Sequence, residues 1–181
     1  MELLPRNRDG ESERKSMSKE KPFAKGDYVV YPTHGVGQVM GIEKQEISGT
    51  NLEVIVVNFA KEKMTLRVPV GKSVTSGMRG LSSRKTMENA LITLRGRARV
   101  KRTMWSRRAQ EYEAKINSGD PISIAEVVRD LHRNAGQPDR SYSERQLYEA
   151  AFERLIREFA AVEKIEHHAA TERLEKVLEV A

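Results

Sequence analysis

The sequence contains no cysteine among its 181 residues. This absence excludes disulfide bonds, a thiolate nucleophile and cysteine-ligated metal sites, and it suits a reducing compartment. Long apolar runs are also lacking, because no stretch approaches the roughly twenty residues that a helix needs to cross a bilayer. The N-terminus has no apolar core typical of a signal peptide either. We therefore expect a cytoplasmic protein with no membrane contact.

Patterns that would indicate catalysis are equally scarce. The four histidines show no metal-ligand spacing, and the adjacent His167 and His168 would point to different faces of a helix. Gly35 and Gly37 lack the strand-to-helix context and the third glycine of a nucleotide-binding loop. Acids between residues 144 and 179 alternate with Arg and Lys at helical spacing, which predicts a solvated helix face. We expect no enzymatic activity, no bound metal and no cofactor.

Positive charge is concentrated in one segment. The chain carries 32 Lys and Arg against 26 Asp and Glu, and residues 95–108 hold seven of the cations and the only tryptophan without any acid. Each cation can neutralise a phosphate and release a counterion, and an apolar plate among cations can wedge into a minor groove. The segment therefore predicts contact with DNA. Its candidate residues are Trp105, Arg107, Arg108, Arg102, Lys101 and Arg99.

Trp105 has a second interpretation. A lone tryptophan at the start of a helix is more often an anchor of the hydrophobic core than a ligand-binding residue. The helix predicted here begins near Thr103 or Met104, so Trp105 lies in its first turn, where unpaired backbone N–H groups favour a phosphate. The density of arginine on both sides favours the DNA-facing interpretation.

Periodicity divides the chain into three parts. Residues 1–21 are polar and mixed in charge, which predicts a disordered leader. Short β-prone runs at 28–31, 36–42, 52–59 and 64–70 follow one another without an intervening helix. They predict a small antiparallel β-barrel of Tudor or SH3 type over residues 22–80.

After residue 70 the apolar period changes from two to about 3.6 residues. Helical stripes occupy 87–94, 105–116, 124–131, 148–159 and 174–178. Asp120 before Pro121 and Ser141 before Glu144 are start signals for two of these helices. Residues 82–181 thus predict an all-α bundle of about five helices, and the chain a two-domain α+β protein. Because no helix shows a sustained heptad seam, we expect a monomer.

Three segments together resemble a known family. They are residues 23–37 (FAKGDYVVYPTHGVG), 66–69 (LRVP) and 105–108 (WSRR), and the likeness extends through 118–120 and 125–131. This pattern is similar to the CarD/CdnL family of bacterial transcription regulators and covers about residues 22–180. The first segment also occurs in the polymerase-binding module of transcription-repair coupling factors, whose helicase motifs this chain lacks.

The resemblance implies a Tudor-like domain that docks on the β subunit of RNA polymerase and a helical domain that contacts promoter DNA. Trp105 matches the family's wedge tryptophan, which fills the minor groove at the upstream edge of the melted region and stabilises the open complex. Arg67 matches a polymerase-contacting arginine. Gln45 and Gln110 depart from the pattern, because some members carry an arginine and a lysine there. The implied polymerase-binding residues are Arg67, Gln45, Leu66 and Val68.

Two function classes follow from these observations, and a third has little support. The leading hypothesis is a nucleoid-associated, non-enzymatic regulator that binds RNA polymerase and promoter DNA together, with weak sequence specificity. The alternative is a stand-alone basic nucleic-acid-binding protein, of RNA chaperone or nucleoid type, that needs no polymerase. A hydrolase acting on nucleic acid has no residue that we can name as its catalyst.

Overall fold

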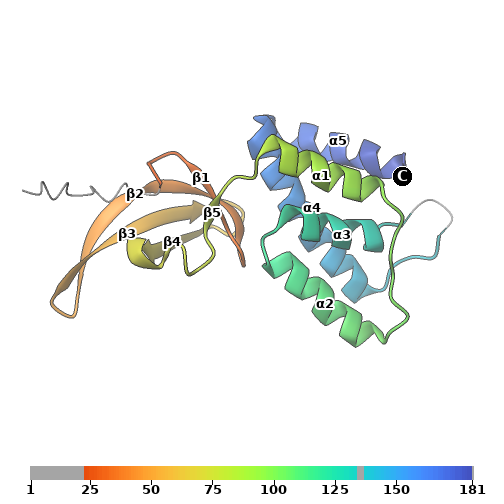
Figure 1. Ribbon diagram of the computed structural model, residues 1–181, viewed down its shortest axis with the longest axis horizontal. Helices are drawn as coiled ribbons and strands as arrows, with labels where there is room; N and C mark the ends of the chain where they lie inside the picture. The colour runs from red at the N-terminus through yellow and green to blue at the C-terminus, as the bar shows by residue number, and fades with distance from the viewer. Residues whose placement is uncertain (1–22, 134–136, 181) are drawn as a thin grey trace, which may run out of the picture.

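The computed structural model describes residues 23–133 and 137–180. Within them the chain forms a five-stranded antiparallel sheet followed by five helices, with the sheet at one end of the molecule and the helices at the other (Figure 1). The α+β class and the five predicted helices are thereby confirmed. The leader predicted over residues 1–21 lies outside the described residues.

The sheet contains β1 (Tyr28–Tyr31), β2 (Gly35–Ile47), β3 (Thr50–Phe59), β4 (Met64–Pro69) and β5 (Arg79–Gly80). Its order is β4-β3-β2-β1-β5, with every described pair antiparallel. Since β4 and β5 lie at opposite edges and do not pair, the described sheet is not closed, and the prediction of a barrel was wrong in this respect. The two residues of β5 are too few to show an alternating pattern, so this strand was not predicted.

One face of the sheet carries its core. Val29, Val39, Ile55, Val57 and Phe59 are almost fully buried together. Position 37 on this face has no room for a side chain, because a Cβ on Gly37 would come within 2.6 Å of Cγ1 of Val57. A β-bulge between Val39 and Gly41 shifts the register of β2 against β3, and bulges increase the local twist of a sheet.

The helices are α1 (Arg84–Arg95), α2 (Trp105–Asn117), α3 (Pro121–Leu131), α4 (Tyr142–Glu163) and α5 (His167–Glu179). The predicted caps are confirmed: Asp120 accepts hydrogen bonds from the backbone of Ile122 and Ser123, and Ser141 accepts one from Glu144. Each such cap satisfies a backbone N–H that the helix leaves unpaired and contributes about 1 kcal/mol.

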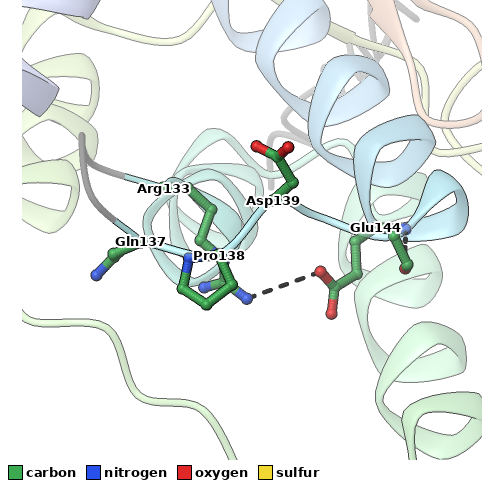
Figure 2. Close-up of a pocket in the computed structure, with 6 residues that line it drawn as sticks. Arg133, Gln137, Pro138, Asp139 and Glu144 are labelled. Carbon is green, nitrogen blue, oxygen red and sulfur yellow. Dashed lines mark hydrogen bonds and ion pairs between the residues drawn. The ribbon is translucent and has the colours of Figure 1, made fainter.

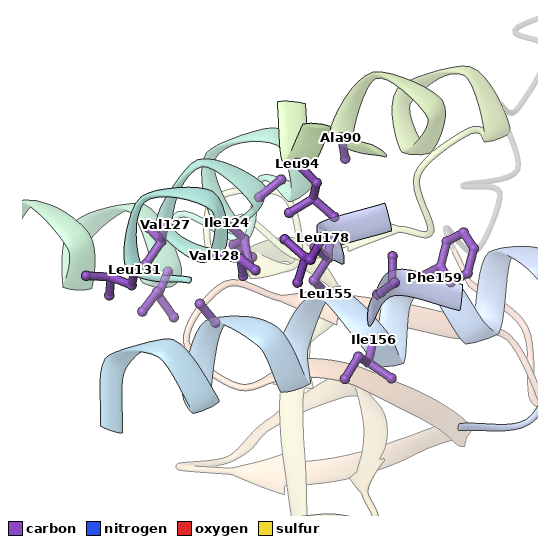
Figure 3. Close-up of a cluster of buried hydrophobic side chains, with 14 of the residues drawn as sticks. Ala90, Leu94, Ile124, Val127, Val128, Leu131, Leu155, Ile156, Phe159 and Leu178 are labelled. Atoms are coloured by element: carbon purple, nitrogen blue, oxygen red, sulfur yellow. The ribbon is translucent and has the colours of Figure 1, made fainter. Parts of the chain in front are cut away.

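The helical core lies around α3, whose apolar side chains are enclosed by α1, α2 and α4 (Figure 3). Val128 of α3, Leu94 of α1, Leu155 of α4 and Leu178 of α5 are each at most 2% exposed. Full burial of one such side chain stabilises the fold by about 1.5–3 kcal/mol. This packing gives the surface described below a rigid support.

Charged side chains of α4 fasten the helices to the sheet. Arg154 donates hydrogen bonds to the carbonyl oxygens of Pro32 and Thr33, in the β1–β2 turn, and of Ile116 at the end of α2. Glu158 is only 3% exposed and accepts two hydrogen bonds from Arg79, at 2.8 and 3.1 Å. The backbone N–H and the hydroxyl of Ser82 also donate to it. The prediction of a wholly solvated acidic face on this helix was therefore wrong for Glu158.

Candidate nucleic-acid interface and sheet edge

Trp105 is the first residue of α2 and is neither free nor fully buried. Its ring packs against the helical core, and the ring of Tyr112 lies 6.4 Å away. The indole Nε1–H donates a 2.9 Å hydrogen bond to Oγ of Ser143, in the first turn of α4. Trp105 is therefore both a core anchor and a surface residue, because one part of its ring packs against the core while the remainder reaches the surface.

The side chain of Arg108 also lies beside the indole of Trp105. Its guanidinium carbon lies 5.5 Å from the centroid of the Trp105 ring, within range of a cation–π interaction. The Nε atom of Arg108 is buried from water and has no hydrogen-bond partner among the described residues. An unpaired buried donor costs free energy, so the packing of Arg108 against the indole carries a local cost.

The remaining cations of the predicted site differ in whether their charged groups are already paired with an acid. Arg99, Arg102 and Arg107 are exposed, and the backbone N–H of Arg99 is held by the carboxylate of Asp130 at 2.9 Å. Lys101 is engaged instead, because its Nζ lies 2.9 Å from Glu111, and this hydrogen bond lowers the pKa of Glu111. Lys101 must give up this exposed ion pair to meet a phosphate, so its contribution is smaller than its charge suggests.

The N-terminus of α2 adds partial positive charge at the same place. Met104 occupies the N-cap position and makes no side-chain hydrogen bond to the first turn. A helix end without a cap leaves backbone N–H groups to solvent or to an anion, and the helix dipole favours negative charge there. The end of α2 is therefore electrostatically compatible with a phosphate beside Trp105.

The start of α4 is fixed where it meets Trp105. Figure 2 shows the segment that precedes it, with Arg133 reaching across to Glu144 at 3.7 Å. The guanidinium of Arg140 also covers the ring of Tyr148 at 3.9 Å. The contact of Arg140 holds the segment before α4 to that helix, and the ion pair of Arg133 links the first turn of α4 to the chain that leaves α3. Ser143 consequently offers its hydroxyl from a defined position.

The predicted polymerase-binding residues lie on β4 and β2. β4 is an edge strand, so one row of its backbone hydrogen-bonding groups has no partner strand. The register places Arg67, Glu43 and Gln45 on one face of the sheet. Nε of Arg67 lies 3.6 Å from Glu43 across β3, and both side chains are about half exposed, at 50% and 54%. A surface pair of this kind is weak and can exchange for a partner's acid.

The side chains of Leu66 and Val68 point to the opposite face of the sheet from that of Arg67. Alternation along β4 turns both toward the core face, where Leu66 is partly buried and Val68 is only 5% exposed. Their side chains are committed to the sheet, so these two residues can offer a partner mainly their backbone groups.

Sequence reasoning missed Ser143 and the junction residues of α4. Ser143 is one of several serines near a helix start, and its link to Trp105 spans 38 positions of the chain. Glu158 was detectable in principle, because it occupies the same helix stripe as the buried Ala151 and Leu155. An acid at an apolar position indicates a specific partner.

Metal and membrane patterns are also lacking in the described part of the chain. No cluster of three or more potential metal ligands is formed there. None of its helices is long and apolar enough to cross a membrane.

Comparison with known proteins identifies the family. The model described as CarD-like/TRCF RID domain matches residues 23–81, and the model described as CarD, C-terminal domain matches residues 89–175. The chain belongs to the CarD/CdnL family of transcription regulators. The resemblance found in the sequence is thereby confirmed, and so is a role in transcription regulation. Members of this family are generally not enzymes.

Two CarD/CdnL relatives match different lengths of the chain. A Bacillus subtilis (strain 168) protein named "Putative transcription factor YdeB" is 28% identical over 143 residues, which cover 79% of this chain and 94% of the relative. The solution structure of the N-terminal domain of Myxococcus xanthus CarD is 34% identical and covers 32% of this chain and 77% of its own, with a TM-score of 0.29.

Proposed function

We propose that this CarD/CdnL protein docks on the β subunit of RNA polymerase through its sheet and stabilises the open promoter complex through Trp105. The observation that carries the proposal is the pairing of two surfaces in one chain. A sheet matching the CarD-like/TRCF RID model has a free edge at β4, and the helices that follow it present a tryptophan among cations.

The docking step uses the edge of the sheet. A partner strand added to β4 would gain main-chain hydrogen bonds, with Leu66 and Val68 supplying backbone groups. Specificity would come from Arg67, which can exchange Glu43 for an acid of the polymerase, with Gln45 on the same face. Docking in turn raises the effective concentration of the DNA-contacting helices at the promoter.

The DNA step uses the half-buried indole. Its exposed part fills the minor groove at the upstream edge of the melted region, while Arg99, Arg102, Arg107 and Arg108 face the phosphates. Reannealing of the upstream edge then requires displacement of the wedge. A contribution of only about 1.4 kcal/mol already extends the lifetime of the open complex tenfold. Because this surface reads phosphates and groove shape, it predicts weak sequence specificity.

Two substitutions test the proposal with purified polymerase and promoter DNA. Trp105→Ala should leave polymerase affinity unchanged and shorten the half-life of the open complex in a competitor challenge. Arg67→Glu should instead abolish polymerase binding, because the new carboxylate lies beside Glu43 and would repel an acidic side chain of the polymerase. An unchanged half-life for the first variant, or full binding by the second, would refute the corresponding step.

The alternative function has a distinct signature. A stand-alone nucleic-acid-binding protein would bind DNA with a steep salt dependence and without polymerase. It would lose little affinity on Arg67→Glu. Affinity measured with polymerase alone, with DNA alone and with both, at about 0.15 M salt where the Debye length is about 8 Å, separates the two functions.

A further inference from the structure

We propose that the first turn of α4 is a second element of the DNA-contacting surface, in which Ser143 orients the indole of Trp105 and Tyr142 extends its apolar area onto promoter DNA. This inference rests on the proposed function and assigns further residues to it. It concerns a helix that begins 37 residues after Trp105 in the chain but touches it in the fold.

The orienting role of Ser143 follows from the geometry of the indole. Trp105 has one hydrogen-bond donor, Nε1–H, and Oγ of Ser143 accepts from it at 2.9 Å. Oγ of Ser141 lies 3.4 Å from the same hydroxyl. With Arg108 over the ring and the N–H held, the indole has one preferred orientation before DNA arrives. Preorganisation of this kind raises affinity, because the freedom of the ring is not lost on binding.

Tyr142 and Met104 are exposed apolar residues that adjoin, in the chain, the two partners of this hydrogen bond. Tyr142 directly precedes Ser143 and is 76% exposed, while Met104 directly precedes Trp105 and is 78% exposed. Large apolar side chains so exposed, and gathered where two helix ends meet, are typical of an interaction surface rather than of ordinary solvent-facing positions. An aromatic ring beside the wedge can stack on a base that the melted edge exposes.

The charge around these residues selects the partner. Arg102 and Arg107 on the α2 side and Arg145 on the α4 side are exposed. The acid of that turn, Glu144, is paired with Arg133. Two helix N-termini also direct their partial positive charge to the same place. An apolar surface framed by positive charge fits nucleic acid, which combines phosphates with stackable bases.

The orienting role has a direct spectroscopic test, because Trp105 is the only tryptophan of the chain. Ser143→Ala removes the acceptor, so we expect altered indole emission and greater quenching by acrylamide in the free protein. Ser143→Thr keeps a hydroxyl and should restore both signals. If emission and quenching are the same in Ser143→Ala as in the parent protein, Ser143 does not orient the ring and that role is overturned.

The contact role is tested by the half-life of the open complex with full-length protein, RNA polymerase and promoter DNA. Loss of one hydrogen bond predicts a half-life about two- to tenfold shorter for Ser143→Ala, with recovery in Ser143→Thr. Tyr142→Ala should also shorten it, while Tyr142→Phe, which keeps the ring, should not. Ile92→Ala is the matched control, since Ile92 is a 63% exposed apolar residue of α1.

The outcomes separate this inference from the proposed function. If Trp105→Ala shortens the half-life while Ser143→Ala and Tyr142→Ala do not, the inference is overturned and the wedge stands. If Trp105→Ala has no effect, both are overturned. Polymerase affinity of each variant must match that of the parent protein, and circular dichroism must show that each variant is folded at the assay temperature; Tyr142→Phe provides a second comparison should Tyr142→Ala unfold.

Discussion

Replacement of Glu158 by glutamine tests the junction between the sheet and the helices. The carboxylate is 3% exposed and accepts hydrogen bonds from Arg79 and from both donors of Ser82. Glutamine keeps the shape of the side chain but has one acceptor oxygen, and its NH₂ group would face a donor. The variant therefore leaves a partly buried guanidinium without its counter-charge.

The magnitude follows from burial. Breaking a fully buried ion pair costs about 3–5 kcal/mol. The side chain of Arg79 is 33% exposed, and solvent screens part of that loss, so we expect about 2–3 kcal/mol. For a chain of this size each kcal/mol lowers the melting temperature by about 2–4 °C, which predicts a decrease of about 4–12 °C.

Thermal unfolding of the full chain, followed by circular dichroism, measures this decrease. Glu172→Gln is the matched control, because its carboxylate is 56% exposed and pairs with an 85% exposed His168. Its effect should remain within about 0.5 kcal/mol. A melting temperature of Glu158→Gln within about 1 °C of the parent protein would show that this network does not hold the sheet and the helices together.

Two further substitutions test electrostatics and packing. Burial raises the pKa of Glu153, but hydrogen bonds from Arg157 and His167 outweigh it and leave that pKa below its ordinary value of 4.5. A carboxyl group whose pKa is lowered in the folded state stabilises the fold above its unfolded-state pKa. The free energy of urea unfolding of the parent protein should therefore exceed that of Glu153→Gln most near neutral pH, and the difference should disappear as the pH falls below about 4.5. A difference that grows in acid would contradict this sign. Gly37→Ala should cost about 1–3 kcal/mol in urea unfolding, because a Cβ would collide with Val57, whereas Gly71→Ala meets nothing within 4 Å and should be neutral.

Local patterns predicted most of the secondary structure. The run at 28–31 is β1 with the expected bounds, and the caps at Asp120 and Ser141 lie where the sequence indicates them. These features depend on residues within a few positions of each other. Periodicity and capping chemistry therefore identify them without knowledge of the fold.

Long-range pairings were not predictable in the same way. Whether the sheet closes depends on which strand lies beside β4, and no local pattern encodes that choice. The hydrogen bonds from Arg79 to Glu158 join residues 79 positions apart, and the one from Trp105 to Ser143 joins residues 38 apart. Trp105 itself was predicted as a DNA-facing residue from its neighbours. Only the fold shows that its ring is also anchored.

Arg154 donates its hydrogen bonds to main-chain oxygens, those of Pro32 and Thr33 in the β1–β2 turn and that of Ile116 at the end of α2. These hydrogen bonds depend on where the backbone carbonyl groups lie and not on the identity of the side chains beside them. Position 33, whose threonine is exposed, can therefore accept new side chains provided that the carbonyls of the turn still point at the helix, whereas the ring of Pro32 lies against Gly77 and Gly119. Lysine could not replace Arg154, because a single ammonium cannot span oxygens from two separate segments in the way that a planar fork does. Libraries that vary position 33 should thus retain helix attachment, whereas a one-residue insertion in the turn should abolish it.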